Sequence, residues 1–136
     1  MSALDRALLG AFAIFAAATG LFLLAAPHTF YANVPGVAAT GSFNAHFLRD
    51  VGLAYVTLTV GAAFALFRPE YALPVTAMAA ADLLGHAALH VFMEIPVVAS
   101  GNGTTVLAEA PGIYLPAAFA LVLVVRAASA ARRRHS

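Results

Sequence analysis

The sequence predicts an all-α integral membrane protein, a four-transmembrane-helix bundle built as one domain over residues 1–136. Two observations lead to this fold class. Hydrophobic residues make up 62% of the chain and charged residues 10%, whereas soluble domains are roughly 45–50% apolar and about 25% charged. The chain also contains four apolar segments, each of the about 20 residues that a helix needs to cross a bilayer. So little polar surface cannot cover a globule in water.

The spans are expected over residues 7–26, 43–67, 71–93 and 112–131. The first apolar run is longer than the roughly 7–15 residues of a cleaved signal sequence, so we expect it to stay as a helix. The second and third spans are separated only by 68–70, which makes them antiparallel neighbours. The fourth is followed by Arg132, Arg133 and Arg134, a run typical of an anchor at the lipid headgroups.

The placement of the arginines predicts that both termini are cytoplasmic. Arg6 precedes the first span, Arg68 lies in the short turn, and four arginines follow from Arg126 onward. The connections 27–45 and 95–111 contain no arginine. Because cytoplasmic flanks of membrane spans carry an excess of Arg and Lys, these two connections are expected outside. We expect the bacterial inner (cytoplasmic) membrane as the location.

The chain contains neither lysine nor cysteine, and its net charge is +1. The lack of lysine excludes Schiff-base chemistry, and the lack of cysteine excludes disulfide exchange and thiolate nucleophiles. A net charge so close to zero creates no basic field for nucleic acid. The expected partners are therefore the lipid bilayer and, beyond it, further copies of the chain or a larger membrane complex, with no nucleic acid.

Ionisable residues are concentrated on two of the predicted spans. The second span begins with Asn44, His46, Arg49 and Asp50, and the third carries Asp82, His86, His90 and Glu94. Spacings of three and four place side chains on one face of a helix. Because the two spans are antiparallel neighbours, the first set is expected at the depth of His86 and His90, in the outer half of the bundle. Charged groups inside a membrane are costly and by default mark function.

Imidazoles and carboxylates in this pattern favour a metal site. We expect its ligands to be His46, Asp50, His86 and His90. These groups suit a divalent Zn, Cu, Fe or Mn ion. The groups expected to tune its charge or to bind a small ligand are Arg49, Asp82, Glu94, Asn44 and Tyr55. A haem b clamped between His46 and either His86 or His90 is the alternative cofactor.

The segment 43–55 resembles small bacterial four-helix membrane proteins of unknown function. In those proteins a helix opens with an Asn-x-His-x-x-Arg-Asp-x-Gly-like pattern, which here runs from Asn44 to Gly52. A later helix there carries His-x-x-x-His followed by an acidic residue, matched here by the stretch from His86 to Glu94. The resemblance implies the four-helix fold and singles out the same polar residues. It implies no activity.

The leading hypothesis is a polar His/Asp site between the second and third spans, near the outer face, that binds a metal ion or a small ligand. Two other functions stay open. The chain could be an accessory or structural subunit of a larger membrane complex, with the polar residues as contacts between helices. It could instead be an intramembrane acid–base enzyme acting on a lipophilic substrate. Whether it is an enzyme at all is left undecided by the sequence.

Overall fold

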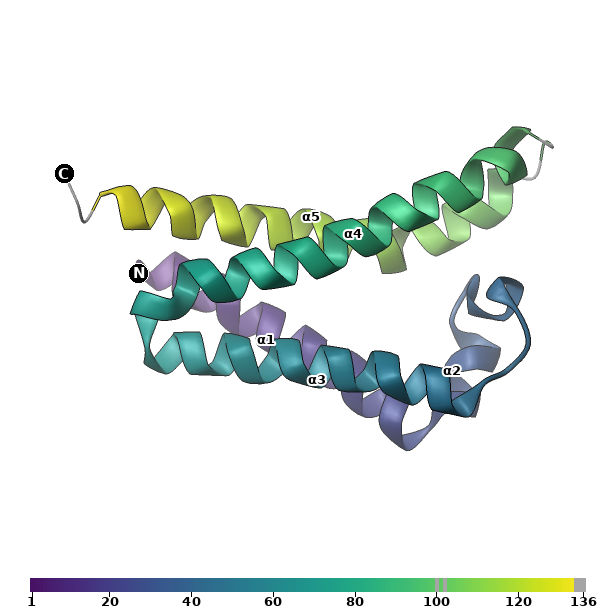
Figure 1. The fold of residues 1–136 in the computed structure, drawn as a ribbon, viewed down its shortest axis with the longest axis horizontal. Coiled ribbons are helices and arrows are strands. Elements are labelled where there is room, and N and C mark those ends of the chain that lie inside the picture. The colour runs from purple at the N-terminus through teal and green to yellow at the C-terminus, as the bar shows by residue number, and fades with distance from the viewer. Residues whose placement is uncertain (100, 102, 134–136) are drawn as a thin grey trace.

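A computed structural model describes residues 1–99, 101 and 103–133, and it is helical along almost all of this length (Figure 1). The elements are α1 (Ala3–Ala25), α2 (Pro27–Asn33), the 3-10 turn η1 (Val37–Thr40), α3 (Ala45–Phe67), the 3-10 turn η2 (Pro69–Tyr71), α4 (Ala72–Ala99) and α5 (Gly103–Arg132). Four of these helices are long and apolar enough to cross a membrane: α1, α3, α4 and α5. The predicted all-α fold with four membrane-capable helices is confirmed.

The long helices are arranged as two pairs. Helix α1 packs along α3, and α4 packs along α5, while contacts between the pairs are much fewer. Figure 1 shows the pairs side by side near the chain termini and diverging toward the end that carries α2. The turn η2 joins α3 to α4 and thereby links one pair to the other. Both termini lie at the same end of the bundle (Figure 1), and their cytoplasmic placement stays a prediction.

The pairs meet in a core of small and apolar side chains. Leu9 and Phe12 of α1 are almost completely buried, and the Phe12 ring meets Phe119 of α5 edge to face at 6.0 Å. The other helices contribute mainly alanines to this core: Ala62, Ala65, Ala79, Ala80, Ala117 and Ala120. Small side chains let helix backbones approach closely, which is the main source of helix association in lipid. The core therefore sits toward the end that holds both termini.

Within the first pair, two glycines allow the closest approach. A Cβ at Gly20 of α1 would lie 2.9 Å from the carbonyl oxygen of Gly52 of α3, and a Cβ at Gly52 would lie 3.0 Å from the Cβ of Leu23. Both glycines are buried in the helices that they belong to. Neither position has room for a side chain, so this contact sets the spacing between α1 and α3.

Helices α4 and α5 extend well beyond the spans that we predict on either side of residue 101. Helix α4 continues beyond 93 to Ala99, and α5 begins at Gly103 rather than at 112. The prolines at 96, 111 and 116 lie inside these helices, where the sequence pattern indicates a connection or a helix start. Prolines are tolerated in membrane helices because neighbouring groups satisfy the freed carbonyls. As a result, residues 103–111 form an additional helical stretch opposite the end of α4.

The glycine contact predicts a specific loss of stability. We expect Gly20→Ala to lower the free energy of unfolding by about 1–3 kcal/mol, because a side chain inserted at a tight contact forces the backbones apart. Gly10→Ala, in the same helix, is the control, since a Cβ there meets nothing within 4 Å. It should be neutral or stabilising by up to about 1 kcal/mol. Unfolding in mixed micelles, followed by circular dichroism, measures both; equal losses would contradict this view of the contact.

Candidate metal centre

Three potential metal ligands converge between α4 and α5. His90 and Glu94 lie one turn apart on α4, and Glu109 reaches them from α5. The Nδ1 atom of His90 lies 3.5 Å from Oε1 of Glu94 and 4.0 Å from Oε2 of Glu109. One ligand atom from each residue falls within 4.8 Å of the others. Among the residues that the structure describes, this is the one group of three or more such side chains.

The group is largely shielded, with side-chain exposures of 14% for His90, 12% for Glu94 and 14% for Glu109. The hydroxyl of Tyr114, on α5, donates a hydrogen bond to Oε2 of Glu94 at 2.6 Å. The other oxygen of Glu94, Oε1, is buried and has no hydrogen-bond partner within the described part of the chain. A carboxylate oxygen in this condition is costly unless a cation or proton occupies the space beside it.

The arrangement leaves two carboxylates close to a single imidazole. Over residues 1–99, 101 and 103–133, no arginine lies within ion-pairing distance of Glu94 or Glu109. A protonated His90 could balance only one negative charge. Ligands held about 2.0–2.2 Å from one ion are separated from each other by about 3–4 Å, so the two distances from His90 suit a shared cation. The ring of His86 stands beside that of His90, with 4.8 Å between ring centroids.

The polar residues at the start of α3 have partners outside the convergent group. Nε2 of His46 lies 3.6 Å from Oδ2 of Asp50, and these side chains are 89% and 55% exposed. The Asn44 side chain accepts hydrogen bonds from the backbone N–H groups of His46 and Phe47 and so caps α3. Nε of Arg49 donates to the backbone oxygen of Leu24 at 3.5 Å. This last contact places a positive charge at the negative end of α1.

Asp82 and His86 lie on α4 before His90, beside the core residues Leu83 and Ala87. Both are exposed in the isolated chain. Asp82 interacts electrostatically with His86 and with Tyr55 of α3. Tyr55 is half-buried, and its ring meets Phe15 of α1 edge to face at 6.1 Å. These residues continue the polar line along α4 toward the middle of the span.

The structure thus brings together only part of the predicted site. His90 and Glu94 belong to the convergent group, while His46 and Asp50 pair with each other on α3. The ligand set of His46, Asp50, His86 and His90 stays a prediction. Sequence reasoning does not find Glu109, because the prolines and glycines of 95–111 predict a connection, nor Tyr114, which lies in the predicted span 112–131 with no ionisable residue beside it. A short turn between two antiparallel helices at Gly101 would have identified Glu109 as a neighbour of Glu94. The two residues lie about equally far from Gly101, one after it and one before it.

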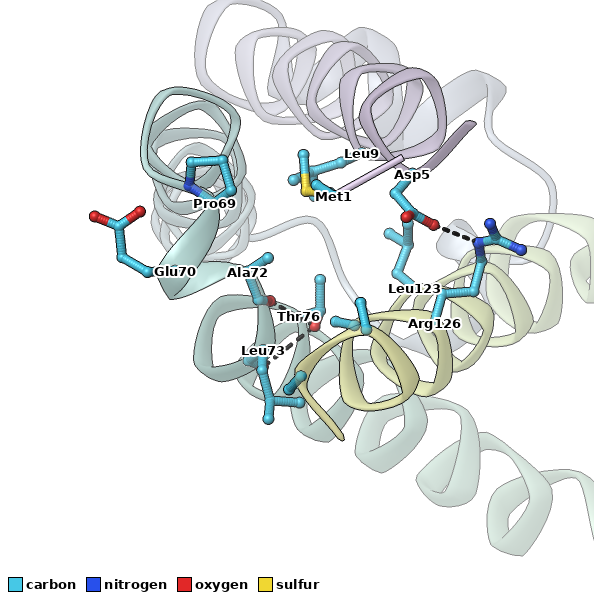
Figure 2. A pocket seen from close by; sticks show the side chains of 13 residues that line it. Met1, Asp5, Leu9, Pro69, Glu70, Ala72, Leu73, Thr76, Leu123 and Arg126 are labelled. Atoms are coloured by element: carbon cyan, nitrogen blue, oxygen red, sulfur yellow. Dashed lines mark hydrogen bonds and ion pairs between the residues drawn. The ribbon is translucent and has the colours of Figure 1, made fainter. Parts of the chain in front are cut away.

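A cavity of about 230 Å³ lies at the opposite end, where α1, α4 and α5 meet (Figure 2). Its walls are mostly apolar, and Nε of Arg126 pairs with Oδ1 of Asp5 beside it at 2.7 Å. Asp5 also accepts hydrogen bonds from the backbone and the hydroxyl of Ser2, which closes the start of α1. We assign these polar groups to joining α1 to α5, because Asp5 and Arg126 already satisfy each other.

No family model, no curated protein and no solved structure matches the chain. The function is therefore inferred from the geometry of its own residues.

The hydrogen bond between Tyr114 and Glu94 predicts a measurable effect on stability. Tyr114→Phe should cost about 1–3 kcal/mol, because it leaves a second oxygen of a buried carboxylate without a donor. Tyr31→Phe is the matched control, since the Tyr31 hydroxyl donates to the backbone oxygen of Gly41 in an exposed setting. This change should stay within about 0.5 kcal/mol. Unfolding of the metal-free protein in detergent compares them, and an equal or smaller loss for Tyr114→Phe would contradict the prediction.

Proposed function

We propose that this protein binds a divalent transition metal ion through His90, Glu94 and Glu109, at the end of the bundle away from its termini. The observation that carries the proposal is the convergence of three potential ligands around a buried carboxylate oxygen that lacks a hydrogen-bond partner. A cation at this point would balance two negative charges that a single imidazole cannot. With the termini on the cytoplasmic side, as the arginines predict, the site would face the outside.

The donor set favours particular metals. Imidazole suits Zn²⁺, Fe²⁺ and Cu²⁺, whereas carboxylates favour harder ions such as Mn²⁺. One imidazole with two carboxylates therefore fits Mn²⁺, Fe²⁺ or Zn²⁺ best. A haem b would need His46 opposite His86 or His90, whereas the His46 side chain is 89% exposed on α3 and its Nε2 lies 3.6 Å from Oδ2 of Asp50. The residues present thus fit a bare ion better than a haem.

Three protein ligands leave coordination positions for water or for a small ligand. The hydroxyl of Tyr114 would hold the Glu94 carboxylate in place from behind, as outer partners of metal ligands usually do. His86, whose ring lies 4.8 Å from that of His90 and is tilted against it, would lie within reach of a molecule bound at an open position. A site of this kind would serve either a protein that transports the ion or one that uses the bound ion in a reaction.

Titration with Co²⁺, whose absorption spectrum changes on binding, tests the proposal in protein purified without a histidine tag. Glu94→Gln and Glu109→Gln keep the size of each side chain and remove its charge. Since even outer partners of metal ligands contribute about 10–100-fold to affinity, each substitution should weaken binding by more than about 100-fold. Elemental analysis of the purified protein would identify the native metal.

Asp50→Asn is the control, because it alters a residue of the ligand set predicted from the sequence but lies outside the convergent group. It should leave Co²⁺ affinity unchanged. Absence of binding to the wild-type protein would refute the proposal. Loss of binding in Asp50→Asn, with retention in Glu109→Gln, would instead support the site between α3 and α4.

A second candidate function is supported by a separate observation. Asp82 and His86 are exposed on α4 although they lie within a membrane-capable helix. Ionisable side chains in spans normally face protein or water rather than lipid. We propose on this basis that the face of α4 around them contacts a second copy of the chain or another subunit of a membrane complex.

Native mass spectrometry from mild detergent tests this second candidate. The wild-type protein should be released as an oligomer or with a bound partner, and Asp82→Asn should shift it toward the free chain. Asp50→Asn, an equally conservative change on α3, should leave the assembly intact. A wild-type protein released only as a single chain would exclude the candidate.

A further inference from the structure

The connection between α2 and α3 touches the metal centre from the other helix pair. Gly36 lies in this connection with a φ of +84°. A Cβ built on Gly36 would overlap Cγ and Cδ of Glu109 and lie 2.7 Å from its Oε1. The side chain of Glu109 therefore crosses directly over the backbone of Gly36. No side chain can occupy this position while Glu109 keeps its present conformation.

This contact links parts of the fold that otherwise have little in common. Gly36 follows α1 and α2, whereas Glu109 belongs to α5, and the shared core of the two pairs lies toward the opposite end. The α2–α3 connection, the end of α4 and the start of α5 lie at the same end of the bundle (Figure 1). Glu109 is thus placed between Gly36 on one side and Nδ1 of His90, at 4.0 Å, on the other.

The connection is braced by its own contacts. The backbone N–H of Ala39 donates to the oxygen of Gly36 at 2.9 Å, and the Tyr31 hydroxyl donates to the oxygen of Gly41 at 2.8 Å. The rings of Tyr31 and Phe43 meet at 5.4 Å. Glu109, in contrast, has a flexible side chain with several rotatable bonds. If a side chain were added at Gly36, Glu109 would therefore move before the connection does.

We propose that Gly36 is a positioning residue of the metal centre: its bare backbone lets the α2–α3 connection close over Glu109 and hold this carboxylate toward His90. The inference rests on the proposed function. It adds that the affinity of a site built on α4 and α5 is set by a connection that belongs to the α1–α3 pair. On the side of Glu109, the α2–α3 connection therefore covers the metal centre.

The test compares two alanine substitutions in the full-length protein. Gly101 has a φ of +85°, almost the same as Gly36, but a Cβ there meets nothing within 4 Å. Gly36→Ala and Gly101→Ala each place a side chain at a positive φ, which is strained for residues other than glycine, and only the first displaces Glu109. In a Co²⁺ titration, Gly36→Ala should weaken binding by about 10–100-fold, the effect usual for residues that orient a metal ligand.

A purely structural role would affect both variants alike. We expect Gly101→Ala to bind Co²⁺ as the wild type does, and the metal-free forms of both variants to melt at similar temperatures. If either alanine variant fails to fold, Gly36→Asn and Gly101→Asn replace the pair, because Asn tolerates positive φ better than other residues with a side chain.

The possible results distinguish the role of Gly36 from metal binding itself. A wild-type protein that binds no Co²⁺ would overturn both. A wild-type protein that binds Co²⁺, with equal affinity in the two glycine variants, would overturn only the role of Gly36. A selective loss in the variant at position 36, with an altered Co²⁺ spectrum, would support the connection as the cover of the site.

Discussion

The close contact of α1 with α3 at Gly20 and Gly52 is the interaction on which the rest of the arrangement depends. In hydrocarbon, helices gain nothing by hiding apolar side chains from their surroundings, so they associate through tight packing of small residues. Here the carbonyl oxygen of Gly52 approaches the space where a side chain of Gly20 would be. This contact fixes α1 against α3 and thereby fixes where the connection between them can reach.

The second helix pair, α4 and α5, packs closely through alanines instead of glycines. It also carries the three residues of the metal centre. The pairs share a core toward the termini and diverge toward the other end (Figure 1). His90, Glu94 and Glu109 lie beyond this core, where the segment at Gly36 contacts Glu109. The charged group therefore lies outside the part of the bundle where the two helix pairs pack together.

The polar residues of α3 and those of α4 make different kinds of contact. On α3, the side chain of Asn44 caps its own helix, and Arg49 binds the end of α1. The contacts of Asn44 are local, whereas the contact of Arg49 joins α3 to α1. On α4, the spacing of His90 and Glu94 correctly identifies a polar face. Their partner Glu109 escapes sequence reasoning because it lies in a stretch whose prolines and glycines predict a loop, and Tyr114 escapes it because nothing along its own helix marks it as a partner of Glu94.

The sequence by itself determined the class of the protein: its apolar composition and four long segments require membrane-spanning helices, and spacing of four residues determines which side chains share a face. Only the tertiary structure decided which helix that face meets. The spacing of polar residues along one helix shows which side chains share a face, but it does not show which helix packs against that face. The choice of the packing helix depends on where small residues allow two helices to approach. Here α4 packs along α5 rather than along α3, so His90 and Glu94 meet a carboxylate that no spacing rule on α3 could supply.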